Sequence, residues 1–322
     1  MKSGTFSDPI FRDPEKARAW LETELWPQGP VCPHCGTLGE ATYVEGEKHT
    51  HRDGLYMCNA CRKQFTVTVG TLFERSHIPL NKWLFALFLF MSSKKGVSAH
   101  QVHRMIGVSY KSTWFMMHRL REALREGIFT EPLGGAGKTV EMDEAYIGGL
   151  EKFKHRNKRK HAGGGGKGKE AVFALVERGG SVRSHHVPTV NAKTLRPILT
   201  AQVSRASYLM SDDSVHSRQL GMEYGWHQTV NHSAGEYVRG NAHTNTIEGY
   251  FSIMKRGIHG VYHHVSPQHL KRYLAEYDFR YNERTALGVT DEARTAKAVK
   301  GIVGKRLTYR RTGSAKPSVP LA

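Results

Sequence analysis

The chain has 322 residues, of which 39% are hydrophobic and 24% are charged, a composition typical of globular rather than disordered proteins. Its 47 Lys and Arg residues exceed its 29 Asp and Glu residues, which gives a formal net charge of +18. This excess favours a polyanionic partner such as nucleic acid, because Lys and Arg at phosphates release condensed counterions. The longest apolar run, residues 83–91, is far shorter than the ~20 residues that span a bilayer, so we expect no membrane partner. We see no export signal and expect a cytoplasmic protein with reduced thiols.

All four cysteines fall in two C-x-x-C pairs, Cys32 with Cys35 and Cys58 with Cys61, separated by 22 residues. Each C-x-x-C turn presents two thiolates, so two such turns complete the tetrahedral shell that Zn²⁺ prefers. We therefore predict one structural Zn²⁺ in a small zinc ribbon. Two disulfides are the alternative, which a cytoplasmic location disfavours.

Residues 98–124 carry apolar side chains at helical spacing on both sides of Gly107, after an apolar helix predicted over residues 80–91. Two short helices around a glycine turn fit a helix-turn-helix, whose second helix enters the major groove of DNA. We expect Lys111 and Arg119 to project from that second helix as DNA contacts. An ordinary helical hairpin is the alternative, and the neighbouring zinc ribbon and the overall charge favour DNA.

The pattern changes after Pro132, where a Gly-rich linker precedes a series of strand-like segments. Helical segments separate or follow the later strands. The predicted strands are residues 139–147, 170–177, 182–187, 208–210 and 226–230. Three strands, a helix and two further strands predict a mixed five-stranded α/β sheet.

Three acids stand at the ends or in the middle of these elements. Asp143 lies in the first strand, Asp212 follows the fourth, and Glu248, separated from Asp212 by 35 residues, lies in a helix predicted over residues 246–258. Hard cations prefer carboxylate oxygens. Two Mg²⁺ ions about 3.5–4 Å apart activate the attacking oxygen and stabilise the leaving oxygen of a phosphoryl displacement. Strand ends and a facing helix bring distant acids together without flexible loops.

The ordered motifs of the chain resemble those of an insertion-sequence DDE transposase of the ISXO type, with an N-terminal zinc ribbon. The resemblance covers roughly residues 10–290, and its order is more specific than any single motif. The motifs are CPHCG at Cys32, MCNACRKQF at Met57, VEMDEAYIGG at Val140, VNHSAGEYVRG at Val230, HTNTIEGYFSIMKRGIHGVYHHVS at His243 and YDFRYNER at Tyr277.

The resemblance implies a ribonuclease-H-like core that cleaves and joins DNA with two Mg²⁺ or Mn²⁺ ions per active site. It implies that Asp143, Asp212 and Glu248 hold these ions. Lys255 lies about two turns beyond Glu248 on nearly the same helical face, where we expect it and Arg256 to contact DNA phosphates. The expected partners are double-stranded DNA, as element ends and target, and a second copy of the chain in a homodimer or larger assembly. We expect the protein at the bacterial nucleoid.

Several assignments stay open in the sequence. Asp213 is the ligand if the register shifts by one residue, although the motif favours Asp212. Glu141 and Glu144 flank Asp143, and Glu141 points to the same side of an alternating strand. Two further residues are expected near the acids: Asn245 and His263.

A basic segment between the first two core strands carries six Lys and Arg residues in nine positions and is followed by glycines. It buries too little apolar surface to fold alone, so we expect it to contact the DNA backbone and to order on binding. The basic residues are Lys152, Lys154, Arg156, Lys158, Arg159 and Lys160.

The sequence thus predicts a multidomain protein. The expected divisions are residues 1–70 for the first helix and zinc ribbon, 71–132 for the helix-turn-helix, 133–290 for the catalytic core with a basic insertion at 151–169, and 291–322 for a basic tail. Two rival functions remain: a regulator with the same DNA-binding parts and no catalysis, and a metal-dependent nuclease that does not join strands.

Overall fold

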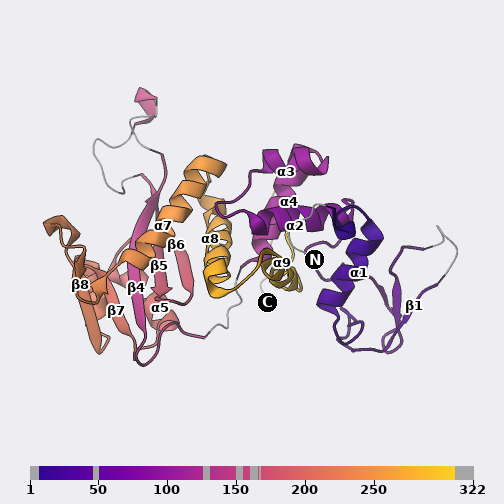
Figure 1. Ribbon diagram of the computed structural model, residues 1–322, viewed down its shortest axis with the longest axis horizontal. Coiled ribbons are helices and arrows are strands. Elements are labelled where there is room, and N and C mark those ends of the chain that lie inside the picture. Colours follow the sequence, from indigo (N-terminus) through magenta and orange to yellow (C-terminus); the bar gives the residue numbers. More distant parts are fainter. Residues whose placement is uncertain are drawn as a thin grey trace, which may run out of the picture. The chain divides into compact units, whose positions relative to one another are not determined.

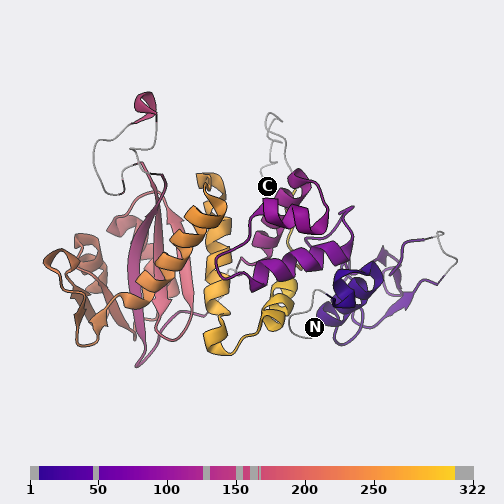
Figure 2. The ribbon, with the colours of Figure 1, turned by 45° about the horizontal axis from the view of Figure 1, so that its top comes forward.

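The computed structural model describes residues 7–45, 51–125, 131–149, 155–159, 166 and 168–308. They form two compact units (Figures 1 and 2). The first unit draws on Met1–Phe88, Ala99–Ala123 and Thr295–Ala322, and the second on Leu89–Ser98 and Leu124–Arg294. Over these described stretches, every helix is too short or too polar to cross a membrane.

The first unit begins with α1 (Pro14–Leu25) and a small antiparallel sheet of β1 (Ala41–Tyr43), β2 (Tyr56–Cys58) and β3 (Gln64–Phe65). The carboxylate of Asp13 caps α1 by accepting hydrogen bonds from the backbone N–H groups of Glu15 and Lys16, and Pro14 takes the first helical position. The side chains buried beneath the small sheet are few: Cys32, Cys58 and Phe65, with Trp26 and Tyr56 beside them. A core of this size cannot hold a ribbon together by apolar burial alone.

Three helices follow: α2 (Leu80–Ser92), α3 (Ala99–Ile106) and α4 (Tyr110–Ala123). Gly107 joins α3 to α4 with a φ of 62°, the left-handed conformation that glycine adopts without steric cost. The buried face of α3 is Val102 and Ile106, whereas α4 is exposed at its first turn and buried along most of the remainder.

The chain returns to the first unit at its C-terminal end. The sequence predicts a basic tail from residue 291, but α9 spans Asp291–Lys300. The backbone N–H of Leu72 donates to Ile302 O, and Thr71 forms an antiparallel bridge with Val303. Residues 291–303 therefore form a helix and a paired extension rather than a tail, because Ile302 and Val303 pair with Leu72 and Thr71.

The second unit is built on a mixed five-stranded sheet in the order β6–β5–β4–β7–β8, as predicted. β4, β5 and β6 pair antiparallel, and β4, β7 and β8 pair parallel. This arrangement is the one expected for a ribonuclease-H-like core. The strands are β4 (Thr139–Ile147), β5 (Glu170–Glu177), β6 (Val182–Val187), β7 (Tyr208–Asp212) and β8 (Trp226–Val230).

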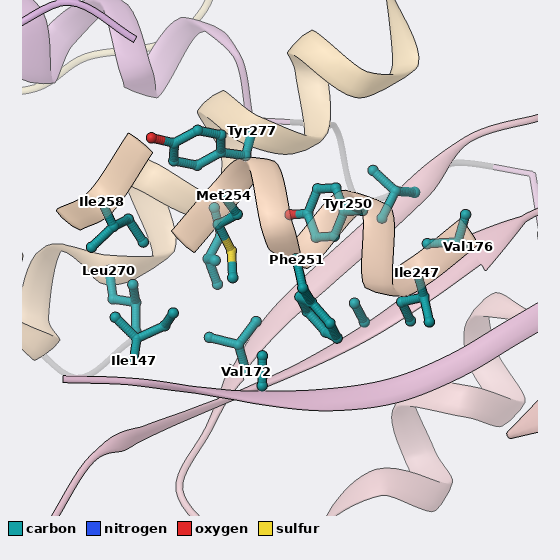
Figure 3. Close-up of a cluster of buried hydrophobic side chains, with 14 residues drawn as sticks. Ile147, Val172, Val176, Ile247, Tyr250, Phe251, Met254, Ile258, Leu270 and Tyr277 are labelled. Atoms are coloured by element: carbon teal, nitrogen blue, oxygen red, sulfur yellow. The ribbon is translucent and has the colours of Figure 1, made fainter. Parts of the chain in front are cut away.

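Helices cover both faces of this sheet. One face holds α5 (Ala192–Gln202) and α6 (Val215–Gly221), and the other holds α7 (Asn245–Gly257) and α8 (Pro267–Asn282). Side chains alternate between the two faces along each strand: Ala145 and Ile147 of β4 face α7 and α8, while Val140 and Met142 face α5. The cluster beneath α7 includes Ile247, Phe251 and Met254 (Figure 3).

Several short elements complete the two units. A hairpin of β9 (Val238–Arg239) and β10 (Ala242–His243) leads into α7. Single helical turns lie at Pro9–Phe11 in the first unit and at Arg156–Lys158, His232–Ala234 and Thr285–Leu287 in the second, and a π-helical turn at Ile258–Tyr262 extends α7.

The hydrophobic cluster under α7 fixes the position of this helix. We therefore predict that Met254→Ala lowers the free energy of unfolding by about 2–5 kcal/mol. Met254 is fully buried, so the truncation leaves a cavity against the sheet. Urea denaturation followed by circular dichroism measures the change. Ser252→Ala, at an exposed position on the same helix, is the control and should shift stability by less than about 0.5 kcal/mol. Equal effects of the two variants would contradict this packing.

Candidate active site and metal centre

The four cysteines of the first unit lie together as free thiols. Their sulfur atoms all lie within 4.8 Å of one another. The Sγ atoms of Cys32 and Cys61 are 3.7 Å apart, and those of Cys35 and Cys58 are 3.6 Å apart. Tetrahedral Zn–S bonds of about 2.3 Å imply sulfur separations of about 3.8 Å, so the donor set fits Zn²⁺.

Both C-x-x-C turns use the same backbone geometry. The N–H of Gly36 donates to Cys32 O, and the N–H of Arg62 donates to Cys58 O, so each turn closes back on its first cysteine. Gly36 and Arg62 follow the second cysteine of their turns and both have a positive φ, 78° and 58°. A non-glycine residue with this φ is unusual and marks a turn held by its surroundings. The repeated geometry shows that two similar loops present the four sulfurs.

In the second unit, the parallel pairing of β4 with β7 brings two of the predicted acids together. The paired residues end at Met142 and Ser211, so the next residues along the two strands are Asp143 and Asp212. Neighbouring strands lie about 4.8 Å apart. Alternation places both side chains on the α7 side of the sheet, where Met210 of β7 also packs.

The third acid, Glu248, lies in the first turn of α7. Its Oε1 accepts a hydrogen bond from the Thr244 hydroxyl at 3.3 Å and lies 3.6 Å from His232 Nε2. The His232 ring stacks on Tyr237, with centroids 5.2 Å apart. One oxygen of Glu248 is therefore already oriented by the segment that connects β8 to α7.

The acids interact electrostatically. The pKa of Asp143 is raised to about 8, chiefly by burial; the hydrogen bond from the Glu144 N–H opposes this rise, and the charges of Glu144, Asp212 and Glu248 add to it. Burial and the charge of Asp212 raise the pKa of Glu144 to about 7. Carboxylates that hold protons near neutral pH are typical of a site that receives a cation.

Asp212 and Asp213 point to different surroundings. Oδ1 of Asp212 accepts from the Ser217 hydroxyl at 2.9 Å. Asp213 accepts two hydrogen bonds from Arg218, at 2.6 and 2.5 Å, and the Arg218 side chain lowers its pKa. An acid engaged by a bidentate guanidinium is less available to a cation than Asp212 is.

The acids are less tightly grouped than the cysteines. Within the described part of the chain, the cysteine cluster is the sole group of three or more metal-binding side chains at such short range. Two ions about 3.5–4 Å apart require a wider ligand set than one ion.

The remaining predicted residues of this region lie along α7 and beyond it. Lys255 and Arg256 are exposed on its last turns, and Lys255 Nζ lies 5.9 Å from the centre of the Phe251 ring. Asn245 is exposed at the first position of the helix, next to the turn that holds Glu248. His263 is exposed and has a φ of 58°, within a tight turn closed by the His264 N–H and Tyr262 O.

The other residues predicted to bind DNA differ in whether their side chains are exposed. Lys111 is exposed on the first turn of α4. Arg119 does not project as expected: it lies over the Trp83 and Phe115 rings, donates to Glu74 O, and has its pKa lowered by burial. In the basic insertion, Arg156 and Arg159 are exposed and Lys158 belongs to a helical turn. Three of its residues lie outside the described part of the chain: Lys152, Lys154 and Lys160.

Sequence reasoning missed two residues of this site, His232 and Thr244. Both fall inside the motifs quoted above, at Val230 and His243, and their places beside motif residues are the available signal. The four-residue spacing of Thr244 from Glu248 was a further signal, because such residues are neighbours on a helix. The spacing of His232 from Glu248 predicts no contact, because the β9–β10 hairpin lies between them.

We predict about one Zn²⁺ per chain, bound by the four sulfurs. Cys35→Ser should lose the metal and unfold the ribbon, because its small apolar core cannot stand alone. Elemental analysis and thiol titration measure this. His34→Ala is the control: its ring lies in the same turn but contacts Gln64 O, so zinc content should not change. Full zinc occupancy in Cys35→Ser would contradict the assignment.

Comparisons with known proteins agree with this arrangement. Residues 132–282 match the ISXO2-like transposase domain, and residues 12–64 match the transposase zinc-ribbon domain. A Halobacterium salinarum protein described as an uncharacterized protein in transposable element ISH50 is 29% identical over 281 residues, 84% of this chain and 91% of that relative. The first match contains the three acids and the second contains the four cysteines. The chain therefore carries a region that matches the transposase zinc-ribbon domain followed by one that matches the ISXO2-like transposase domain, in the order that the resemblance of its motifs implies.

Proposed function

We propose that the chain binds the ends of an insertion sequence and catalyses DNA strand cleavage and strand transfer with two divalent cations. The ligands are Asp143, Asp212 and Glu248. The observation that carries this proposal is the side-by-side placement of Asp143 and Asp212 on parallel strands, within electrostatic reach of Glu248. Mutual repulsion of partly buried carboxylates is relieved when cations bind between them.

The donor set suits Mg²⁺ or Mn²⁺, which prefer oxygen ligands. Such ions lower the pKa of an attacking water or 3′-hydroxyl and stabilise the departing 3′-oxygen of the scissile phosphodiester. Asp143 and Asp212 would supply oxygens from the rigid sheet, and Glu248 would supply one from α7, the helix that faces them. Thr244 and His232 orient Glu248 through its Oε1.

The reaction has two steps in this proposal. Water first attacks a phosphorus at the element's end, the bond to the 3′-oxygen breaks, and that oxygen takes a proton to become a 3′-hydroxyl. The hydroxyl then attacks a phosphorus of target DNA, releasing another 3′-oxygen. The chain contributes positioning and charge, with Lys255 and Arg256 as exposed cations on the helix of Glu248.

DNA recognition falls to the first unit and to the basic insertion. The α3–α4 pair acts as a helix-turn-helix that presents the first turn of α4, with Lys111, to the major groove. The insertion places Arg156, Lys158 and Arg159 near DNA phosphates. Two ends must be joined, so the active form is a homodimer or larger assembly.

We predict that Asp143→Asn, Asp212→Asn and Glu248→Gln each lower DNA cleavage by about a hundredfold or more, since changing even outer partners of a metal ligand costs 10–100-fold. The assay uses a plasmid carrying the element's ends with Mg²⁺ or Mn²⁺, and gels separate nicked, linear and joined products. Asp213→Asn is the matched control, because it is the same change one residue away at an acid paired with Arg218.

The outcomes separate the rival functions. DNA binding without cleavage in the unmodified chain would favour the regulator, and cleavage without joined product would favour the nuclease. Loss of activity in Asp213→Asn but not in Asp212→Asn would exchange the two ligands. Full activity of all three acid variants would contradict the proposal.

The raised pKa values predict a pH dependence. Without divalent cations, the folded chain holds protons on Asp143 up to about pH 8 and on Glu144 up to about pH 7, whereas the unfolded chain releases them near pH 4. The folded state therefore binds more protons across this window, and its stability contribution from these groups falls as pH rises from about 4 to 8. Cations compete with those protons, so Mn²⁺ should raise the melting temperature more at about pH 8.5 than at about pH 6.

Thermal unfolding of the zinc-loaded chain with and without Mn²⁺ measures this difference. In Asp143→Asn, which has no carboxyl at that position to titrate, the effect of Mn²⁺ should shrink at both pH values. A Mn²⁺ effect in the unmodified chain that is the same at both pH values would contradict the coupling between protons and cations.

A further inference from the structure

Glu141 is a completely buried carboxylate on β4, two residues before Asp143. Alternation along the strand places both side chains on the α7 side of the sheet. Burying a charge is costly unless it is paired and hydrogen-bonded. The groups that pair with this buried acid therefore show which elements it holds together.

The partners of Glu141 come from distant parts of the second unit. Arg178, which follows β5, donates from Nε to Oε1 at 2.6 Å. From the first turn of α7, the Thr246 hydroxyl donates to Oε1 at 2.8 Å and the Ile247 N–H donates to Oε2 at 2.9 Å. His243 Nδ1 lies 3.3 Å from Oε1. Both oxygens of Glu141 thus accept protein donors, which separates it from the acids assigned to metal.

The contact with Ile247 caps α7 from another element. The first N–H groups of a helix have no partner within it and are usually satisfied by the side chain of the residue before the helix. That residue here is Thr244, whose side chain makes no capping hydrogen bond. Glu141 accepts from the third N–H of the helix instead, and its negative charge also suits the helix N-terminus.

Arg178 extends this connection to the strand that leads into α7. Besides Glu141, its guanidinium donates to Asn241 O at 2.9 Å and to His243 O at 2.8 Å. One Glu–Arg pair thus holds the first turn of α7 and the end of the β9–β10 hairpin against β4.

We propose that Glu141 is a positioning residue for the metal site. It ties the residue directly before Glu248 to the strand that carries Asp143, and so fixes the distance between two ligands that the chain supplies more than one hundred residues apart. This inference rests on the proposed function, because it assigns Glu248 and Asp143 to the same cations. Residues that orient metal ligands affect affinity by about 10–100-fold.

The test measures Mn²⁺ binding to the full, zinc-loaded chain by electron paramagnetic resonance titration, without DNA. Glu141→Gln keeps the shape of the side chain and removes its charge, and we expect Mn²⁺ affinity to fall by about tenfold or more. Thr246→Val removes one donor and leaves the carboxylate in place, so we expect a smaller loss, about threefold. Glu177→Gln is the matched control, because Glu177 also accepts from a backbone N–H and a cation, at Gly134 and Lys138. Its side chain follows Phe173 and Leu175 on the α5 side of the sheet, away from α7.

Melting temperatures in the absence of Mn²⁺ separate positioning from general damage. The proposal expects Glu141→Gln to lose affinity at temperatures where it is still folded, while Glu177→Gln keeps it. If Glu141→Gln does not fold, Thr246→Val decides: unchanged Mn²⁺ affinity in it would overturn the positioning role. So would full affinity in folded Glu141→Gln.

Asp143→Asn distinguishes this inference from the function beneath it. Loss of Mn²⁺ binding in Asp143→Asn with none in Glu141→Gln or Thr246→Val overturns the positioning role alone. An unmodified chain that binds Mn²⁺ no better than Asp143→Asn overturns the proposed metal site, and the positioning role with it.

Discussion

The candidate active site depends on the parallel pairing of β4 with β7. Antiparallel neighbours would place the carboxyl ends of these strands at opposite edges of the sheet, whereas parallel neighbours place Asp143 beside Asp212. Burial of Val140, Met142 and Leu209 on the opposite face fixes this register, because a shift by one residue would turn every side chain of the strand to the other face. The apolar core on the α5 side thus determines which acids meet on the α7 side.

Placing these acids close together lowers the stability of the folded chain, and favourable packing around them offsets this loss. The raised pKa of Asp143 reflects mainly the loss of water around its carboxylate and, to a smaller extent, the repulsion between these acids. Between α7 and the sheet, the hydrophobic cluster buries Tyr250, Phe251 and Met254 of α7. This burial holds the helix that carries Glu248 in place. A comparable relation applies to the zinc ribbon, where the metal ligands take the place of a larger core.

The sequence predicted the sheet well because its strands are bounded by turn residues and follow a Gly-rich linker, and all five predicted strands are present. It predicted α9 as tail because that segment is charged and Ala-rich, and its few buried apolar residues reveal a partner surface only in three dimensions. Arg119 was misplaced for a related reason. Helical periodicity gives the direction of a side chain but not the Trp83 ring that lies in its path.

At the site itself, motif order predicted the three acids, and local spacing could not predict the residues that orient them. Glu141 was noticed as an acid on the same side as Asp143, but its contacts with Arg178 and Ile247 depend on how β5 and α7 meet β4. The choice between Asp212 and Asp213 is likewise tertiary, since only the folded chain shows Arg218 occupying the second acid.

Anomalous diffraction from crystals of the zinc-loaded chain grown with Mn²⁺ tests the central claim most directly. The account predicts two Mn²⁺ peaks about 3.5–4 Å apart, contacted by the carboxylates of Asp143, Asp212 and Glu248. Peaks bound by Asp213 instead of Asp212, or Mn²⁺ bound elsewhere with none at these acids, would contradict it.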